Sequence, residues 1–595
     1  MTATPASRSR TELLWLAAIV GLVIVLRVWS LGADPMPELD PGFISDSGTW
    51  WKNARLHALY GVWTVDDGNY AIMTGPAYTL VLRAVFGLLG VGYAQGYAAS
   101  VLSGVLTVIL IYAMVRREAS ARAALLAAAF AGIDLMTIVY SRSAYPESFQ
   151  LMMMTVVVAA IVTSTGRAWL AALGGVGAAI VVLSKPPGIV LAPIATATWA
   201  AHWRTNRAAG QPRPLDRRGI LAYAAAVGAT LIVVGLVYLR PHADDVWLHL
   251  QQQMADAAAL GARATDRVLL FGSRLGYRRN EFFTNEWYLL ILAAALGAAR
   301  LARVLRRPLT TIEVACWLWL LMGLGAMGLQ TYQQDRRFLF LVPPLAIMSA
   351  LLLAEPVELG ESAWQGRRAR RIAVGAAAGL LALVVLFYAV PLGVWKMMTL
   401  GRLLGRTWDY GLAGGLLLSA GLVAAALVAA WRTPQPRWRG RLAPQLALGV
   451  ILLVLVLARA GPELLNRSHG LETVSRLLDR ISAGWPEGDR YAVGWSAGTL
   501  TLATRLIPVN HELKGPKAVE RFHPQLELYA APTGRPVNRH EYWAVPGQPS
   551  KLDCAQVPIW NDAQGRSRIT VHIFVEPNRL AACQDSARVS TSGPH

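Results

Sequence analysis

Two neighbouring stretches decide the fold of this chain. Residues 13–31 read LLWLAAIVGLVIVLRVWSL, and residues 43–55 read FISDSGTWWKNAR. The first stretch is apolar and long enough to cross a hydrocarbon core of roughly 30 Å. The second begins just outside that span, where an acidic side chain between aromatic and basic neighbours suits chemistry better than packing. The sequence therefore predicts a membrane protein with a functional site around Asp46.

The whole chain has the composition of a polytopic membrane protein. Of its 595 residues, 54% are hydrophobic, and the mean hydropathy is +0.40. Apolar runs of about 17 to 22 residues recur as far as Leu457, and each can span a bilayer. A net charge of +20 would suggest nucleic acid as the partner of a soluble protein. Here the basic excess indicates topology, and we expect no nucleic-acid partner.

Arginine clusters determine the predicted topology, because cytoplasmic loops carry the excess of Lys and Arg. About thirteen transmembrane helices place every cluster on one side, together with the basic N-terminus. The clusters lie at residues 116–122, 204–218, 300–307, 367–371 and 432–441. The predicted spans are residues 13–31, 97–115, 121–140, 147–164, 168–184, 187–203, 219–239, 287–304, 309–330, 338–354, 372–392, 410–431 and 443–460.

The apolar stretch 75–90 is not counted as a span. A crossing there would move the cluster at 116–122, and every later cluster, to the outer side. We therefore expect a juxtamembrane or re-entrant helix at 75–90. A tight hairpin is expected at Lys185-Pro186-Pro187. The first span lacks a small-residue cleavage site, which favours a retained anchor over a signal peptide.

The chain changes character after residue 461. Apolar runs shorten, and alternating segments such as residues 568–575, RITVHIFV, are typical of strands. The predicted fold class is an all-α polytopic membrane domain over residues 1–460, followed by a soluble α/β domain over residues 461–595. An odd number of spans places this second domain outside. Cys554 and Cys583 both lie in it and form either a disulfide or two unpaired buried thiols.

Some charged residues on the predicted outer side are not explained by the charge rule. They gather mainly in the loops 32–96 and 240–286. Arg binds phosphate through two hydrogen bonds and Lys supplies a point charge, so a cavity rimmed by them suits an anionic lipid head group. A carboxylate beside them could accept a proton from an attacking hydroxyl or amine. The alternative is that these charges contact ordinary phospholipid head groups.

Residues 46–61 have helical spacing, so Asp46 would begin a surface helix. A helix amino terminus favours an anion and would keep this carboxylate ionised, as a base requires. Aromatic residues such as Trp50 crowd the same loop. They could stack on a sugar or belong to an interfacial aromatic belt.

The order of several motifs resembles the GT-C glycosyltransferases, within which the chain is most similar to the branch of protein O-mannosyltransferases and the lipid A aminoarabinose transferase. Each motif alone is short, and their order and common outer-side placement carry the resemblance. It spans roughly residues 13–355. The motifs are FISD at 43–46, NAR at 53–55, TGPAYTL at 74–80, YSRSAYPE at 140–147, LSKP at 183–186 and YQQDRRFLFLVPP at 332–344.

The resemblance implies that a sugar is transferred, with inversion, from a polyisoprenyl phosphate to an acceptor outside the cytoplasm. The family's catalytic Asp in the first outer loop maps to Asp46. That Asp is usually followed by Glu, whereas this chain has Ser47, so a site with two adjacent carboxylates is in doubt. The aminoarabinose branch has Arg three residues after its Asp, whereas this chain has Thr49. That difference counts against lipid A as the acceptor.

The predicted site combines these family positions with charge placement. Lys185 and Arg336 or Arg337 match residues that hold the phosphate leaving group, and Arg142 and Glu147 match a second outer-side element. Arg278 and Arg279 follow from charge placement alone. The predicted catalytic residues are Asp46 and Glu147, the predicted ligands of the donor phosphate are Lys185, Arg336, Arg337, Arg278, Arg279 and Arg142, and the predicted substrate contacts are Lys52, Arg55, Tyr332 and Trp50.

The sequence leaves open whether the protein binds a divalent cation. The pairs Asp66-Asp67 and Asp244-Asp245 could bind Mg²⁺ or Mn²⁺, or could be solvated loop charges. No Cys/His array or phosphate-cradling glycine loop occurs in the sequence, so no cofactor is predicted with certainty. We expect a multi-pass protein of the inner or plasma membrane with a cytoplasmic N-terminus.

Two other classes of function compete with glycosyl transfer. A transporter or flippase of lipid-linked sugars would share the spans and the basic contacts, but transporters usually place ionisable groups near mid-membrane. Charges within the predicted spans, such as Arg27 and Asp134, lie toward span ends instead. A non-catalytic scaffold would leave the outer acidic and basic residues unexplained. The sugar and the acceptor, whether protein, polysaccharide, glycolipid or lipid A, cannot be deduced from the sequence.

Overall fold

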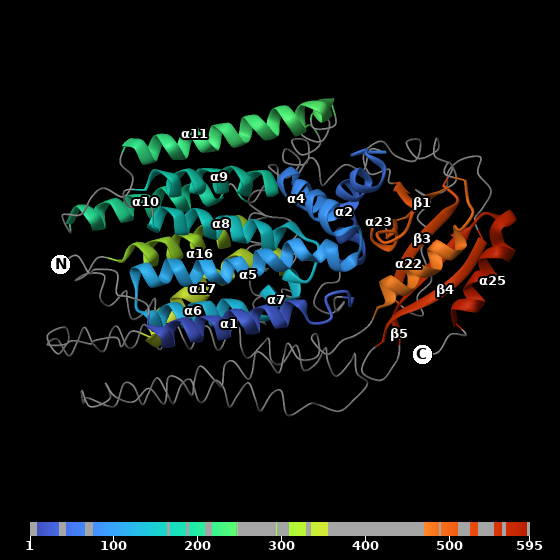
Figure 1. The fold of residues 1–595 in the computed structure, drawn as a ribbon, viewed down its shortest axis with the longest axis horizontal. Coiled ribbons are helices and arrows are strands. Elements are labelled where there is room, and N and C mark those ends of the chain that lie inside the picture. Colours follow the sequence, from blue (N-terminus) through green and yellow to red (C-terminus); the bar gives the residue numbers. More distant parts are fainter. Residues whose placement is uncertain are drawn as a thin grey trace, which may run out of the picture.

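The computed structural model is mostly helical, with a small sheet near the C-terminus (Figure 1). The described residues are 9–34, 43–65, 75–163, 167–185, 188, 190–208, 217–244, 309–328, 335–354, 469–486, 490–494, 496–509, 524–532, 552–561 and 567–591, with the single positions 247, 251, 289 and 293.

Apolar helices form a bundle whose members run along the long axis of the molecule (Figure 1). In this bundle α8 packs against both α5 and α9, and α9 packs against α11. On the other side of α5, α6 contacts α1 and α17. The bundle helices are α1 (Arg10–Val28), α5 (Tyr93–Glu118), α6 (Ala121–Ile133), α7 (Leu135–Ser141), α8 (Pro146–Thr163), α9 (Ala168–Ser184), α10 (Leu191–Ala208), α11 (Arg217–Val234), α16 (Thr311–Gly328) and α17 (Val342–Ala354).

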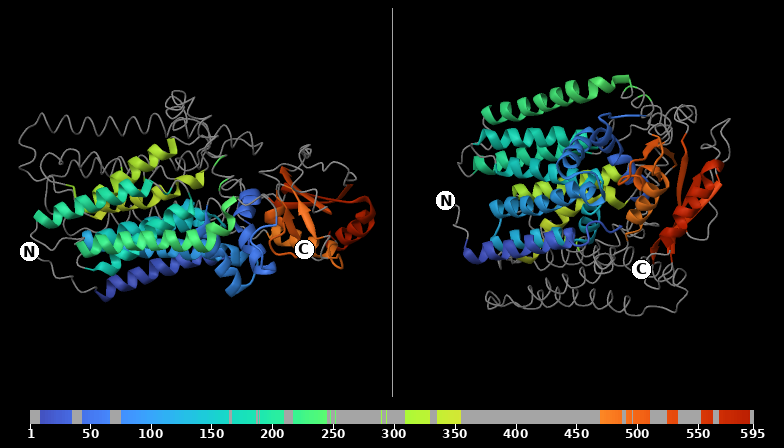
Figure 2. Two further views of the ribbon diagram at one scale, coloured as in Figure 1. Left: turned by 90° about the horizontal axis from the view of Figure 1, so that it is seen from above. Right: turned by 45° about the vertical axis from the view of Figure 1, so that its right-hand side comes forward.

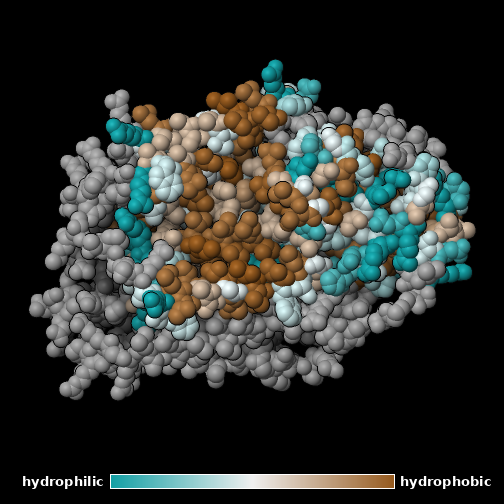
Figure 3. Space-filling view, viewed as in Figure 1, coloured by the Kyte–Doolittle hydropathy of each residue, from teal (hydrophilic) through white to brown (hydrophobic). Residues whose placement is uncertain are grey.

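Several described segments are long and apolar enough to cross a membrane. The five that qualify singly are Arg10–Val28, Tyr93–Glu118, Pro146–Thr163, Arg218–Val237 and Arg336–Ala354. The surface fits this assignment, because the bundle presents a mainly apolar face and the C-terminal part a polar one (Figure 3). The protein is therefore a multi-pass membrane protein.

The predicted spans agree with the described helices wherever both exist. Each predicted span between residues 13 and 239 corresponds to a helix or helix pair, and so do those at 309–330 and 338–354. The predicted spans at 287–304, 372–392, 410–431 and 443–460 lie outside the described residues, apart from positions 289 and 293. The count of thirteen therefore stays a prediction.

The predicted span at 121–140 is bent in its middle. α6 and α7 meet at an angle of 57° around Asp134. The Asp134 side chain accepts a hydrogen bond from the backbone N–H of Thr137 at 2.8 Å, so it caps the first turn of α7. Asp at such a position satisfies one of the N–H groups that a helix start leaves without a partner. The bend therefore changes the direction of the chain just before residues 142–147.

Two short helices lie at the end of the bundle, between it and the sheet (Figure 1). They are α2 (Phe43–Tyr60) and α4 (Pro76–Leu89), which pack against each other. With 14 residues, α4 spans only about 21 Å at 1.5 Å per residue, which is less than the hydrocarbon core of roughly 30 Å. This length fits the juxtamembrane or re-entrant helix expected at 75–90.

The C-terminal part is an α/β unit built on a five-stranded mixed sheet. The strand order is β2-β1-β3-β5-β4, with β1 parallel to β2 and β3, and β5 antiparallel to β3 and β4. The predicted strand at 568–575 is β5. The elements are α22 (Gly470–Ile481), β1 (Tyr491–Val493), α23 (Ala497–Leu500), β2 (Ile507–Val509), β3 (Leu526–Pro532), β4 (Leu552–Asn561), β5 (Ser567–Val575), the short η10 (Pro577–Arg579) and α25 (Leu580–Thr591).

The α/β unit lies at the end of the bundle opposite the N-terminus, as both views in Figure 2 show. Glu12, near the start of α1, pairs with Arg116 at the basic end of α5 at 2.6 Å. Tyr93 at the other end of α5 lies 2.8 Å from the hydroxyl of Ser475 in α22. The basic cluster at 116–122 and the α/β unit are thus at opposite ends of the bundle.

A disulfide joins Cys554 of β4 to Cys583 of α25. It closes a loop over a sequence separation of 29 residues, and it ties a strand at the edge of the sheet to the last helix. Of the two alternatives that the sequence left open, the structure shows the paired one. Cross-links of this kind destabilise the unfolded chain by restricting its conformations.

Replacing Cys554 and Cys583 together by Ala should lower the stability of the α/β unit by about 2 to 4 kcal/mol. The measurement is the melting temperature of the purified full chain, by intrinsic fluorescence or by limited proteolysis of the C-terminal unit. Replacing the buried free thiol of Cys316, which lies in α16, by Ala gives a control that keeps the disulfide. An unchanged melting temperature in the double variant would show that the cross-link contributes nothing.

Candidate active site

Asp46 lies in the first turn of α2, as the helical spacing predicts. The amino terminus of a helix carries partial positive charge and stabilises a carboxylate there. Its Oδ2 atom lies 2.5 Å from Nη2 of Arg336, a residue 290 positions later in the chain. The Asp46 side chain is 29% exposed, whereas that of Arg336 is 6% exposed. Asp46 therefore sits at the open side of a largely buried ion pair.

Arg336 pairs with both carboxylates of a charged cluster, which consists of Asp46, Glu147, Lys185, Arg336 and Arg337. It lies in η4 (Asp335–Leu341), a short 3₁₀ segment that leads into α17. Its Nε atom lies 3.1 Å from Oε1 of Glu147, so one guanidinium pairs with two carboxylates. Its Cζ atom lies 4.2 Å from the ring centroid of Tyr145, within range of a cation–π contact. These partners come from two segments that are far from Arg336 in sequence, one with Asp46 and the other with Tyr145 and Glu147, and together they restrict the guanidinium.

Glu147 and Lys185 form the buried side of the cluster. Glu147 stands in the first turn of α8, directly after Pro146, and Lys185 follows the last residue of α9. The ammonium of Lys185 donates a hydrogen bond to Oε1 of Glu147, and the side chains are 7% and 5% exposed. The second oxygen of Glu147, Oε2, is buried without a hydrogen-bond partner among the described residues.

The cluster has more positive than negative charge. Lys185 and Arg336 pair with Asp46 and Glu147, and the charge of Arg337 acts on Lys185, so the cluster has one formal positive charge in excess. Burial lowers the pKa of Lys185 to about 8; Glu147 opposes this shift, and the charges of Arg336 and Arg337 add to it. A partly buried site with a net positive charge suits a phosphate, which these side chains bind through charge-assisted hydrogen bonds.

Trp50 connects Asp46 to the rest of the site. It lies one helical turn after Asp46 on α2, and its ring centroid is 5.5 Å from Nζ of Lys185. It also meets Tyr78 edge to face, at 6.5 Å between ring centroids. The side chain is buried, so Trp50 lines the interior of the site and not the bilayer interface.

Gly75, in the TGPAYTL motif, is required by this packing. A Cβ at this position would lie 2.6 Å from the ring of Trp50 and 2.7 Å from the carbonyl oxygen of Ser184. Real Cβ atoms do not approach other atoms so closely, so only glycine fits. The start of α4 can therefore lie against α2 and the end of α9, next to Lys185. The motif alone does not reveal this role of its glycine.

Two predicted site residues bind backbone carbonyls instead of joining the cluster. Arg55 is fully buried and donates to three carbonyl oxygens of the α/β unit, within 2.6 to 2.8 Å. Arg142 donates to the carbonyl oxygens of Trp29 at 2.5 Å and Ser30 at 3.2 Å, just after α1. Both side chains therefore have a structural role, and the substrate and phosphate contacts that the sequence suggested for them stay predictions. Lys52 is likewise buried on α2.

Other predicted residues lie outside the described part of the chain. They are Arg278, Arg279 and Tyr332, so their roles stay predictions. Asp66, Asp67 and Asp245, the candidate metal ligands, lie there too, while Asp244 is described. Within the described ranges, no group of three or more His, Cys, Asp or Glu side chains could hold a metal ion. The candidate Mg²⁺ or Mn²⁺ remains a prediction from sequence.

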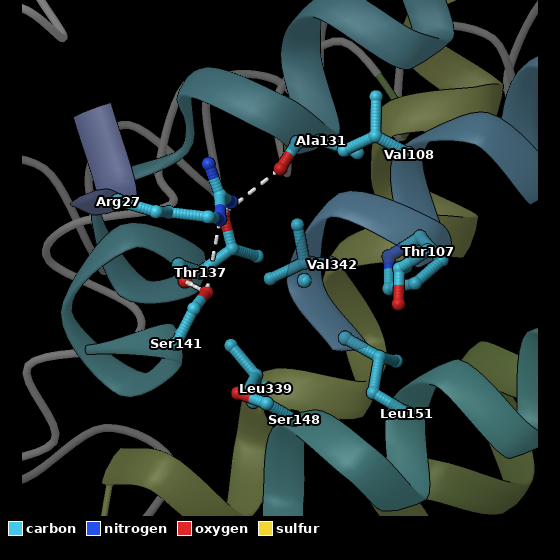
Figure 4. Close-up of a pocket in the computed structure, with 12 residues that line it drawn as sticks. Arg27, Thr107, Val108, Ala131, Thr137, Ser141, Ser148, Leu151, Leu339 and Val342 are labelled. Atoms are coloured by element: carbon cyan, nitrogen blue, oxygen red, sulfur yellow. Dashed lines mark hydrogen bonds between the residues drawn. The ribbon is translucent and has the colours of Figure 1, made fainter. Parts of the chain in front are cut away.

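A buried arginine supports the segment that carries Glu147. Arg27, in the last turn of α1, donates to the carbonyl oxygen of Gly132 at 2.7 Å and to the hydroxyls of Ser141 and Thr137 at 3.1 and 3.2 Å. These groups lie on both sides of the bend between α6 and α7. Arg27 also lines a small internal cavity, together with Ser148, the residue after Glu147 (Figure 4). Its partners hold the path of the chain just before the site.

Comparison with known proteins finds a family model that matches part of the chain and solved structures of similar fold. Residues 74–236 match the family model described as dolichyl-phosphate-mannose-protein mannosyltransferase. No curated protein matches the chain. The crystal structure of ArnT from Cupriavidus metallidurans bound to undecaprenyl phosphate is similar with a TM-score of 0.53 and 16% identity, over 98% of this chain and 99% of that chain. ArnT in the apo state has the same identity and TM-score, over 98% and 100%.

The oligosaccharyltransferase of Archaeoglobus fulgidus, tethered with an acceptor peptide, matches at 14% identity with a TM-score of 0.47, over 88% of this chain and 69% of that chain. The family match covers α4, α8 and α9, with Glu147 and Lys185 of the charged cluster, and the fold shared with ArnT extends over nearly the whole chain. The chain thus has the fold of ArnT, and residues 74–236 match the protein mannosyltransferase family model, in agreement with the resemblance to GT-C glycosyltransferases that its motifs carry.

Proposed function

We propose that this chain transfers a sugar from a polyisoprenyl phosphate to a hydroxyl or amine outside the cytoplasm, with inversion at the anomeric carbon. The observation that carries the proposal is the pairing of Asp46 with Arg336 inside a buried, net positive cluster. A base and a binding site for an anionic leaving group are thereby adjacent. The undecaprenyl phosphate bound to ArnT, which shares this fold, supports the class of donor.

The donor phosphate would be held by Lys185 and Arg336, with Arg337 beside them. Lys185 is a flexible point charge at the end of α9, and Arg336 is a planar group whose orientation Glu147 and Tyr145 fix. As the bond between the anomeric carbon and the phosphate oxygen breaks, negative charge develops on the leaving phosphate. Cations already in place stabilise that charge without a large reorganisation.

Asp46 would act on the acceptor. It is more exposed than Arg336, Lys185 and Glu147, with 29% of its side chain accessible against 5 to 7% for these three. The acceptor hydroxyl or amine loses its proton to the Asp46 carboxylate while its lone pair attacks the anomeric carbon. The phosphate leaves on the opposite face with the electron pair of the broken bond. This direct displacement inverts the anomeric configuration.

The site would face the extracytoplasmic side. Asp46 lies at the end of the bundle next to the α/β unit, and the basic cluster around Arg116 lies at the other end. Because basic loops remain in the cytoplasm, the Arg116 end is assigned there. Residues 461–595 then form a soluble domain outside, and residues 1–460 the membrane domain.

Replacing Asp46 by Asn should lower the transfer rate by about 100 to 10,000-fold, since the amide keeps the shape but cannot accept the proton. Release of polyprenyl phosphate from a panel of polyprenyl-phosphate hexoses and pentoses is measured in proteoliposomes with cell-envelope extract as acceptor. Asp585→Asn, on the exposed face of α25, serves as the matched control. Transfer at the wild-type rate by the Asp46 variant would exclude Asp46 as the base.

The affinity for undecaprenyl phosphate should depend on pH through Lys185. Its pKa of about 8 means that it is charged at pH 7 and loses its charge as the pH rises toward 9. Phosphate monoesters, with a second pKa near 6, are already ionised across this range. The dissociation constant of undecaprenyl phosphate is therefore expected to rise from pH 7 to pH 9, as measured by quenching of tryptophan fluorescence.

Two variants separate this effect from other titrations. Lys185→Arg stays charged throughout, so its binding should vary much less between pH 7 and pH 9. Lys185→Ala should bind about tenfold or more weakly at pH 7, the order expected for loss of one charge-assisted hydrogen bond of about 1.5 to 3 kcal/mol. Equal pH profiles for the wild type and the Arg variant would assign the titration to another group.

A further inference from the structure

The helix α2 has two faces with different partners. Asp46 and Trp50 are four residues apart and therefore share a face, which is directed at the charged cluster. Gly48, Trp51 and Arg55 follow one another at spacings of three and four residues and form a second face. All three contact the α/β unit. α2 thus connects the proposed base to the C-terminal part of the chain.

The contact between Gly48 and Gly498 is backbone against backbone. A Cβ added to Gly48 would lie 2.4 Å from the amide nitrogen of Thr499 and 2.6 Å from the carbonyl carbon of Gly498. A Cβ added to Gly498 would lie 3.1 Å from the carbonyl carbon of Gly48. No flexible side chain lies between the two segments. Neither segment can therefore come closer to the other, or accommodate an added atom, unless the whole segment moves. The spacing between α2 and α23 is therefore fixed.

Thr499 adds directional bonds to this contact. Its hydroxyl accepts a hydrogen bond from the backbone N–H of Gly48 at 3.0 Å and lies 3.3 Å from the hydroxyl of Ser47. Trp51 donates its indole N–H to the carbonyl oxygen of Gly498 at 3.0 Å. From α5, the hydroxyl of Tyr93 donates to the carbonyl oxygen of Thr499 at 3.0 Å. Thr499 is therefore bonded to two separate helices of the membrane part.

Two further contacts secure the α/β unit on the bundle. The guanidinium of Arg55 donates to the carbonyl oxygens of Leu502, Thr504 and Leu506. Asp34, which follows α1, accepts from the backbone N–H groups of Gly470 at 2.7 Å and Leu471 at 3.2 Å, and so caps α22. Buried charge-assisted bonds of this kind are stronger than neutral ones. The unit is attached through residues after α1, through α2 and through α5.

We propose that the C-terminal α/β unit positions the Asp46 carboxylate, and that Thr499 and Gly498 are positioning residues that set where α2 places it. This inference rests on the proposed function of Asp46 and adds a role for a part of the chain outside the charged cluster. Gly48 is only two residues from Asp46, so a shift of α2 at this contact moves the carboxylate as well. Lys185 and Arg336 are carried by α9 and η4 and keep their places.

This arrangement predicts a separation of two kinetic quantities. Displacing a reacting group by about 1 Å can cost up to roughly 100-fold in rate. Loss of the contact should therefore lower kcat for sugar transfer, while the affinity for undecaprenyl phosphate stays the same. A merely stabilising role for the α/β unit would lower the amount of folded protein but leave kcat per folded molecule unchanged.

The test compares Thr499→Val, which removes the hydroxyl but keeps the shape, with Thr499→Ser, which keeps the hydroxyl. We expect kcat to fall about tenfold in the Val variant, within the range that misplacement allows, and to recover in the Ser variant. Trp51→Phe independently removes the indole N–H that donates to the carbonyl oxygen of Gly498, and it should show the same loss. Undecaprenyl phosphate binding, measured for each variant, should match the wild type.

Gly48→Ala tests the backbone contact, and Gly21→Ala is its control, because a Cβ at Gly21 in α1 would meet nothing within 4 Å. Gly48→Ala should lower kcat, whereas Gly21→Ala should not. Should Gly48→Ala fail to fold, Thr499→Val and Trp51→Phe decide the question. If Asp46→Asn is inactive but these variants have the wild-type kcat, the positioning role is excluded; if Asp46→Asn is fully active, the proposed function itself fails.

Discussion

A buried network of four charged side chains joins elements that are far apart in sequence. Asp46 comes from α2, Glu147 from α8, Lys185 from the end of α9 and Arg336 from η4. Removing one member of such a network leaves a buried charge uncompensated, at a cost of about 3 to 5 kcal/mol. The ends of these four elements must therefore meet at one place in the folded protein. The rest of this end of the bundle is arranged around that requirement.

Irregular backbone near the bilayer is tolerated only where protein groups satisfy it. The bend at Asp134 and the segment after α1 meet this condition through side chains. Arg27 binds carbonyl and hydroxyl groups on both sides of the bend, and Arg142 binds the carbonyls of Trp29 and Ser30. Two arginines inside the bundle thus hold the backbone path that leads to Glu147. The hydrogen bonds of these two arginines are local, but the geometry of the charged cluster depends on them.

The sequence predicts the apolar helices well, because long hydrophobic runs have few alternatives to spanning a bilayer. It also brings Asp46, Glu147, Lys185 and Arg336 to the same side, since each follows or precedes a predicted span in a consistent order. Charge placement does not distinguish a ligand-binding arginine from one that captures carbonyl oxygens. Arg55 shows why: its partners are backbone groups of a loop more than 440 residues later.

Close backbone contacts cannot be recognised from a single sequence either. Gly75 and Gly48 look like ordinary loop and helix glycines until the partner that would clash with a Cβ is known. In both cases the partner comes from another element: Trp50 and Ser184 for the first, Gly498 and Thr499 for the second. A glycine can be interpreted from local conformation alone only where its own dihedral angles require it. Here the requirement is set by tertiary contact.

The position of Arg336 links the two halves of the proposed reaction. Its Nε atom faces Glu147, its Nη2 atom bonds Asp46, and its Cζ atom lies 4.2 Å from the ring centroid of Tyr145. A rigid planar group held at three points cannot rotate to follow one partner alone. The base and the proposed phosphate site therefore keep a fixed relation, provided that α2 stays in place. A lysine offers a single ammonium in place of this fork, so it could not hold Asp46 and Glu147 in the same fixed relation.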